Sequence, residues 1–290
     1  MGMRTLQEIY SAPAPVLSVE FWPPKTEAGE AALRREAKSI VGDLNPAFCS
    51  MTYGAGGSTR ERTVDLVSAL HREFGVDVMC HLTVVDQSRA QVRSVLDRLR
   101  ESQVRNIIAL GGDPAPGVEW APHPEGFAHA DELVADAHPE FSVAVAGFPE
   151  VHPRAESRES DLRHLKRKVD LGARVVITQL FFDNDDYFRF VDDARRIGIE
   201  APIVPGVMPI VSVSGIRRFT ALCQARIPDR LAGRLDQVGD DAEAAVRMGI
   251  EYATEQCDEL LRGGAPGLHF YALNKARSVL EINERLGLST

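Results

Sequence analysis

The chain has 290 residues, of which 44% are apolar and 26% charged, and its formal net charge is −9. This composition is typical of a globular protein and excludes an intrinsically disordered chain. The acidic balance, with no separate cluster of Lys and Arg, argues against nucleic acid and anionic membranes as partners. No apolar run approaches the roughly 20 residues of a membrane span, and the N-terminus lacks an apolar signal core, so we expect a cytoplasmic protein.

Short apolar runs alternate with amphipathic segments along the chain. Eight runs are predicted to be strands because they are continuously apolar, as parallel strands are when both faces are buried. These runs are residues 17–21, 47–53, 76–84, 105–112, 141–148, 174–182, 202–210 and 267–274. Each is followed by a predicted helix. After the seventh run we expect a short helix and then an irregular insert.

Eight strand–helix units in this length predict a single domain over residues 1–290 with the α/β fold of a (β/α)8 TIM barrel. An open, doubly wound parallel sheet is the alternative. The Pro-rich segment 113–126 is predicted to be a long loop that acts as a lid. In a barrel the functional residues lie at the C-terminal ends of the strands, so the polar residues there are the candidates for a site.

Glu20 ends the first predicted strand, between the apolar residues Val19, Phe21 and Trp22. Burial of a carboxyl group disfavours its charged form, so we expect a raised pKa for Glu20. A raised pKa suits a general acid near neutral pH. The alternative is a carboxylate paired with a neighbouring cation inside the barrel.

Two glycine-containing turns follow strands. Gly111 and Gly112 precede Asp113, and glycines there let the backbone approach a flat ligand closely, although Asp113 alone also suits a plain turn. The segment TYGAGGSTRERT (52–63) sets a glycine run between a strand and a helix. Its backbone N–H groups are placed to bind phosphate, with an ordinary turn as the alternative.

His81 lies near the end of the third predicted strand and His152 follows the fifth, either as site residues or as buried structural histidines. Together with Glu20 and Asp113 they offer metal-ligand chemistry, but no spacing motif supports a metal site. A metal-dependent lyase or hydrolase therefore remains an alternative.

Residues 161–168 place polar side chains at three- and four-residue spacing on one predicted helix. From the residues alone, this helix face has two interpretations. It is either exposed to solvent, with ion pairs between side chains on successive helical turns, or it binds ribose and phosphate.

Nine segments in order resemble methylenetetrahydrofolate reductase and span residues 17 to 275. They are VEFWPPKT, SMTYGAGGSTRERT, CHLTV, IIALGGDP, VAGFPEVHP, DLRHLKRKVDLGA, VITQLFFD, PIVPGVMPI and GLHFYALNK. The chain resembles the short bacterial form, which lacks a regulatory domain. The resemblance implies a homo-oligomer that binds FAD, takes hydride from NADH or NADPH, and reduces 5,10-methylenetetrahydrofolate to 5-methyltetrahydrofolate for methionine synthesis.

The resemblance also implies residue roles. Glu20 matches the general acid that protonates the departing folate nitrogen, and Asp113 matches a carboxylate that hydrogen-bonds the pterin near the flavin. Gln179 matches a substrate contact, and Tyr271 and Lys275 match the region of the folate tail. The implied flavin site comprises Thr52, Tyr53, Ala55, His81, Gly111, Gly112, Asp113, Phe148, His152, Ala155, Asp161, His164, Arg167 and Lys168.

Three positions depart from the family pattern. The family commonly has Arg where Gly111 stands, Tyr where Phe148 stands and Arg where Lys275 stands. The first two changes remove a cationic donor and a hydroxyl from the flavin site, and Lys does not replace Arg at a bidentate contact. A flavin-independent transfer of hydride from nicotinamide to folate is therefore an alternative. A binding protein without catalysis is disfavoured because Glu20 and Asp113 are both present.

Overall fold

The computed structural model describes residues 2–53, 60–114 and 117–288. Within these residues nine parallel strands form one sheet, in the order β7-β6-β5-β4-β3-β2-β1-β9-β8. The strands are β1 (Val16–Phe21), β2 (Phe48–Met51), β3 (Val78–Thr83), β4 (Asn106–Leu110), β5 (Ser142–Gly147), β6 (Ala173–Thr178), β7 (Ile203–Val204), β8 (Gly206–Val207) and β9 (Gly267–Tyr271).

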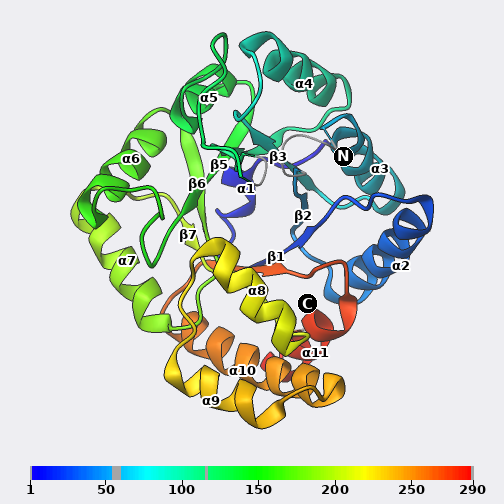
Figure 1. The fold of residues 1–290 in the computed structure, drawn as a ribbon. Coiled ribbons are helices and arrows are strands. Elements are labelled where there is room, and N and C mark those ends of the chain that lie inside the picture. Colours follow the sequence, from blue (N-terminus) through cyan, green and yellow to red (C-terminus); the bar gives the residue numbers. More distant parts are fainter. Residues whose placement is uncertain (1, 54–59, 115–116, 289–290) are drawn as a thin grey trace.

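Helices surround this sheet (Figure 1). They are α1 (Leu6–Ile9), α2 (Glu27–Leu44), α3 (Arg60–Phe74), α4 (Arg89–Glu101), α5 (Ala130–Ala137), α6 (Arg158–Asp170), α7 (Asn184–Arg196), α8 (Val213–Cys223), α9 (Asp229–Val238), α10 (Ala242–Arg262) and α11 (Ala276–Leu286). No helix in the described part of the chain is long and apolar enough to cross a membrane.

The barrel closes at Pro205, which divides its seventh strand into β7 and β8. β7 pairs with β6 through Ile203, and β8 pairs with β9 through Gly206. Proline has no N–H to donate to a sheet. Its carbonyl still accepts a hydrogen bond from the His269 backbone N–H at 3.0 Å. The predicted (β/α)8 barrel is therefore confirmed, and the open doubly wound sheet is wrong.

The prediction of an irregular insert after the seventh strand is also wrong. The predicted short helix is α8, but the chain after it forms α9 and the 21-residue α10. Leu231 and Leu235 of α9 are fully buried in an apolar cluster with Ile216 of α8 and Met248 and Tyr252 of α10. Packing between these helices thus orders a segment that is rich in charged residues, which local sequence patterns do not reveal.

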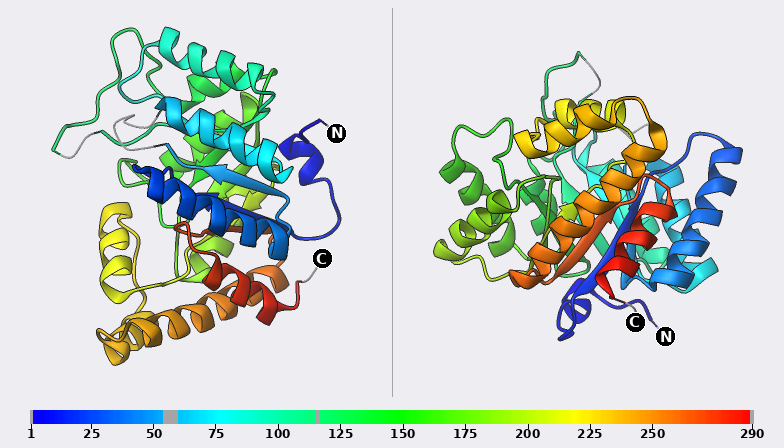
Figure 2. Two further views of the ribbon diagram at one scale, coloured as in Figure 1. Left: turned by 90° about the vertical axis from the view of Figure 1, so that its right-hand side faces the viewer. Right: turned by 90° about the horizontal axis from the view of Figure 1, so that it is seen from below.

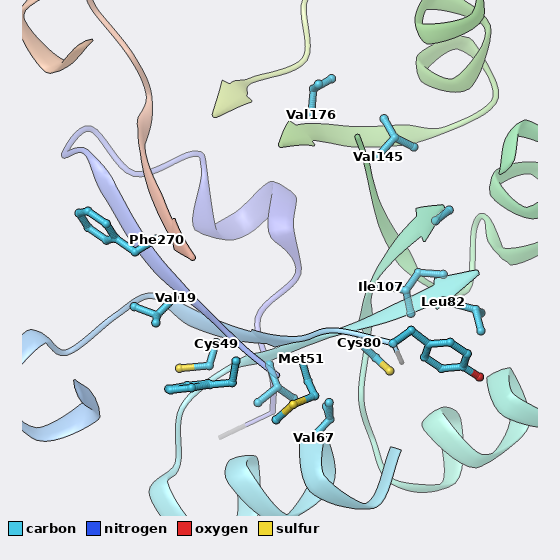
Figure 3. Packing of buried hydrophobic residues seen from close by; sticks show 14 of the residues in the cluster. Val19, Cys49, Met51, Val67, Cys80, Leu82, Ile107, Val145, Val176 and Phe270 are labelled. Carbon is cyan, nitrogen blue, oxygen red and sulfur yellow. The ribbon is translucent and has the colours of Figure 1, made fainter. Parts of the chain in front are cut away.

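Alternate residues of the strands fill two different cores. Outward-facing residues such as Val19, Cys49 and Phe270 pack in one large cluster together with helix residues such as Val67 (Figure 3). A smaller cluster includes strand residues such as Phe48, Met79 and Ile108, and Leu6 and Ile9 of α1 join it. α1 lies at the opposite end of the molecule from the loop after β4 (Figure 2), so the C-terminal ends of the strands stay available for a site.

Candidate active site

Glu20 occupies the last inward-facing position of β1. Because side chains alternate along a strand, Ser18 and Glu20 face the barrel interior while Val19 and Phe21 belong to the outer cluster. The register places Glu20 beside Ser50 of β2 and Tyr271 of β9. Glu20 is only 6% exposed, so the fold holds a buried carboxyl group at the C-terminal end of the barrel.

Two histidines from other strands contact this carboxyl group. Nε2 of His81 lies 3.0 Å from Oε2 of Glu20, and Nε2 of His269 lies 3.5 Å from the same oxygen. Nδ1 of His269 is 2.8 Å from the Ser18 hydroxyl, and its Nε2 is 3.4 Å from the Ser50 hydroxyl. Glu20, His81, His269 and the two serines thus form one buried polar cluster between β1, β2, β3 and β9.

The electrostatics of this cluster contradict the predicted pKa of Glu20. Burial raises the pKa of Glu20, but the charge of His81 and the hydrogen bonds of His269 and His81 outweigh burial and lower this pKa to about 2. The prediction of a raised pKa is therefore wrong for this structure, and the alternative of a paired carboxylate holds. The apolar neighbours of Glu20 in the sequence face outward, whereas its neighbours in space are histidines from distant segments.

Gly111, Gly112 and Asp113 follow β4 directly. Gly112 has a φ of +81°, and a Cβ there would lie 2.5 Å from Cγ1 of Val85. Close packing against the segment after β3 therefore requires this glycine, whether or not a ligand approaches. Asp113 is exposed, and its charge acts on His152 and on Cys223 of α8.

The loop between β5 and α6 brings several predicted residues together. The ring of Phe148 meets the ring of His152 edge-on at 4.5 Å, and the His152 backbone N–H donates to Oδ2 of Asp161 at 3.0 Å. The Ala155 N–H donates to the His152 carbonyl at 2.9 Å. Val151 has a φ of +93°, which is strained for a β-branched residue and is a feature of functional loops.

The predicted residues on α6 have different surroundings. Lys168 donates to the Ala146 carbonyl at the end of β5 (3.2 Å), and burial lowers the pKa of Lys168 despite the charges of Asp161 and Asp131. Arg167 forms an ion pair with Asp131 of α5 at 2.6 Å, and His164 is exposed. Lys168 therefore lies nearest to the strand ends, while Arg167 and His164 lie further out.

The other predicted residues lie at three strand ends. Thr52 and Tyr53 follow β2, and Tyr53 is buried in the main apolar cluster. Ala55 lies outside the described residues. The Tyr271 hydroxyl donates to the Thr178 carbonyl at 2.5 Å, and the Gln179 side chain accepts from the next backbone N–H.

A pocket of about 310 Å³ opens beside the Glu20 strand, between the segments after β1, β8 and β9. Trp22 and Phe219 line it with their rings edge-on at 5.5 Å, and Arg218 and Lys275 add positive charge. Asn274 holds Trp22 in place, because its side chain accepts from the Trp22 N–H at 2.8 Å and donates to the Trp22 carbonyl at 2.9 Å. Lys275 is the one predicted site residue among those lining this pocket.

Several residues of the site were not among the sequence predictions. Ser18 and Ser50 belong to the Glu20 cluster, and strand alternation was the signal that could have placed them on the inward face. Trp22 and Phe219 of the pocket lie far apart in the sequence and come into contact only when the chain folds. In the described part of the chain, no group of three or more His, Cys, Asp or Glu side chains is placed to hold a metal ion.

The chain is similar to known proteins over most of its length. Residues 5–287 match the model of the methylenetetrahydrofolate reductase family. Methylenetetrahydrofolate reductase (NADH) 1 of Arabidopsis thaliana is 40% identical over 285 residues, which cover 93% of this chain and 48% of that protein. The chain thus spans about half the length of its plant relatives. The 5,10-methylenetetrahydrofolate reductase of Escherichia coli is 35% identical, with 94% of this chain and 90% of that protein covered.

A solved structure shares the fold at low sequence identity. An uncharacterized protein from Clostridium thermocellum, described as binding two copies of 5-methyl-5,6,7,8-tetrahydrofolic acid, superposes with a TM-score of 0.63 at 15% identity. The alignment covers 98% of this chain and 99% of that one. On the strength of the family match and the relatives above, the chain belongs to the methylenetetrahydrofolate reductase family.

Proposed function

We propose that this protein reduces 5,10-methylenetetrahydrofolate to 5-methyltetrahydrofolate, with NADH or NADPH as the hydride donor and FAD as the relay. The observation that carries the proposal is the buried Glu20 carboxyl group, held by His81 and His269 at the barrel end where such enzymes have their active sites. Membership of the family supports the reaction, and the names of the plant relatives favour NADH as the donor.

The residues near the barrel end fit FAD, a flat molecule that carries negative charge on its phosphates. His152, Arg154 and Lys168 supply nitrogen donors from the β5–α6 loop and α6. Gly111 leaves space beside them, since Nη2 of Arg154, at 3.8 Å, is the one atom among the described residues beyond its chain neighbours that lies within 4 Å of a Cβ built there. When bound, FAD supplies hydride chemistry between the nicotinamide and the folate.

Glu20 has a proton to deliver in this reaction. The methylene bridge of the folate must open to an iminium before its carbon accepts hydride, so the departing nitrogen needs a proton. Glu20 is ionised in this structure, and its Oε2 lies 3.0 Å from Nε2 of His81. We propose that a proton transferred across this contact converts Glu20 to the acid that protonates the substrate.

Other residues position the substrate. The exposed Asp113 carboxylate, after β4, is an acceptor for the N–H groups of the pterin. Gln179, directly after β6, offers an amide contact from the far side of β5. The pocket with Trp22 and Phe219 suits the aromatic ring of the folate tail, and Lys275 suits its carboxylates.

The substitution Glu20→Gln tests this assignment. We expect it to slow reduction of the folate by about 10²- to 10⁴-fold, the usual contribution of a general acid, because an amide has no acidic proton to give. Oxidation of the nicotinamide by the flavin should stay within a small factor of the wild-type rate. Stopped-flow measurement of the two half-reactions separates these effects. Glu73→Gln, on the outer helix α3, is the matched control.

Two results would count against the proposal. Equal losses in both half-reactions would contradict a general-acid role for Glu20. A purified protein without flavin absorption that still oxidises NADH only when methylenetetrahydrofolate is present would replace the FAD relay by direct transfer.

A further inference from the structure

Arg154 of the β5–α6 loop occupies the space above the end of β4. Its Nη2 atom lies 3.8 Å from the position that a Cβ on Gly111 would take, and it is the nearest atom to that position. Gly111 has no side chain to fill this space. The guanidinium group from the β5–α6 loop therefore lies beside the C-terminal end of β4.

Contacts with two loops hold Arg154 in this place. Its guanidinium carbon lies 5.2 Å from the ring centroid of Trp120, a cation–π distance, and Trp120 stacks on His129 at 5.6 Å. The Arg154 backbone N–H donates to Nδ1 of His152 at 3.0 Å. Arg154 thus connects the loop after β4 with the loop after β5.

In the described part of the chain, no carboxylate neutralises the positive charge of Arg154. Among the residues that the structure describes, none forms an ion pair with Arg154, whereas its neighbours Arg158 and Arg167 pair with Asp193 and Asp131 at 2.5 and 2.6 Å. The charge of Arg154 also reaches His152, whose pKa is lowered first by burial and then by this charge. An unpaired guanidinium group has a planar set of donors that matches phosphate oxygens.

We propose that Arg154 binds a phosphate group of FAD, and that it supplies from the β5–α6 loop the cation that position 111 does not supply from β4. The assignment rests on the proposed function, since it concerns the same cofactor. The charge of Lys168 also acts on His152, so the ammonium group of Lys168 and Nε2 of His152 are further nitrogen groups in the region of the phosphate. Trp120 fixes the direction of the guanidinium group through its ring contact.

Binding of flavins with and without phosphate tests the assignment directly. The full-length protein is freed of flavin and titrated with FAD and with riboflavin, and quenching of flavin fluorescence gives the dissociation constants. We expect Arg154→Ala to weaken FAD binding about tenfold, as for a lost charge-assisted hydrogen bond, and to leave riboflavin binding unchanged. Inorganic pyrophosphate should displace FAD from the wild-type protein, and the variant should bind pyrophosphate about tenfold more weakly.

Matched variants separate a phosphate contact from a structural effect. Arg163→Ala removes an exposed arginine from α6 and should change neither affinity. Gly111→Arg, combined with Arg154→Ala, should restore FAD binding, because position 111 has ordinary backbone angles and open space once Arg154 is removed.

The outcomes distinguish the two proposals. Equal weakening of FAD and riboflavin would show that Arg154 only orders the loops, and unchanged FAD and pyrophosphate binding would show that it contacts no phosphate. Either result overturns the assignment of Arg154 while the proposed function stands. A wild-type protein that binds no FAD would instead overturn the FAD relay itself.

Discussion

The charge of Glu20 is set by residues that come from other strands. Its pKa is lowered from 4.5 to about 2, so the carboxylate stabilises the folded state above pH 4.5. That stabilisation is lost as the pH falls from 4.5 towards 2, because the folded protein then has to take up the proton that the unfolded chain already binds. The same histidines that stabilise the carboxylate lie within 3.0 to 3.5 Å of it, which is close enough for direct proton transfer to Glu20.

Removal of His81 should make the downward shift of the Glu20 pKa smaller. In His81→Asn the charge that opposes burial most strongly is gone, so we expect the pKa of Glu20 to rise from about 2. Infrared difference spectra between this variant and the same variant with Glu20→Gln would follow the protonated carboxyl band against pH. His71→Asn, on the outer helix α3, should leave the band at its wild-type midpoint. A midpoint unchanged in His81→Asn would exclude His81 as the main partner.

The sequence patterns predict correctly that Glu20 lies at the end of the first strand, but they do not predict that it is ionised. A charged residue within a continuously apolar strand marks a strand-end site, and this much follows from local sequence. The pKa depends on His81 and His269, which lie 61 and 249 positions further along the chain and approach only when the barrel closes. The position of Arg154 was not predictable for the same reason, because nothing in the local sequence pattern shows that it lies beside Gly111.

At the scale of elements, the turn after β4 depends on Gly112. The substitution Gly112→Ala adds a methyl group 2.5 Å from Val85 and keeps a φ of +81°, so we expect the free energy of unfolding to fall by about 1–3 kcal/mol or more. Urea denaturation measures this change. Gly75→Ala is the matched control, because Gly75 has a φ of +68° but no atom within 4 Å of its Cβ position. Equal losses in the two variants would mean that backbone strain, not packing against Val85, requires the glycine.

The barrel strands were predictable because burial on both faces makes each of them a continuous apolar run. The predicted ranges are longer than the strands, since the apolar runs continue beyond the last sheet hydrogen bonds, as in residues 179–182 after β6. The helices α9 and α10 were not predictable in the same way. Leu231 and Leu235 of α9 and Met248 of α10 pack in a separate cluster with α8, whereas the C-terminal half of α10 joins the main cluster.

At the scale of the whole molecule, the candidate site joins both halves of the chain. Glu20 and Trp22 come from β1 and the segment that follows it, while His269 and Lys275 come from β9 and the segment before α11. Parallel pairing of β1 with β9 brings these segments together, so neither half of the chain contains the site alone. The expectation of a homo-oligomer stays a prediction.

The pocket between these segments predicts how the folate tail is held. Lys275 is exposed and lines the 310 Å³ pocket, so its ammonium group is available to the tail carboxylates. We expect Lys275→Gln to raise the KM for methylenetetrahydrofolate about two- to fivefold and to leave kcat unchanged, since an exposed ion pair contributes at most about 1 kcal/mol. The wild-type KM should rise with salt concentration more steeply than that of the variant.

Steady-state kinetics at several ionic strengths measure both effects. Arg217→Gln is the matched control for the loss of one positive charge, because Arg217 pairs with Asp236 on α9 and does not line the pocket. Its KM should stay at the wild-type value. A lower kcat with an unchanged KM in Lys275→Gln would place this lysine in the chemical step and not in binding of the tail.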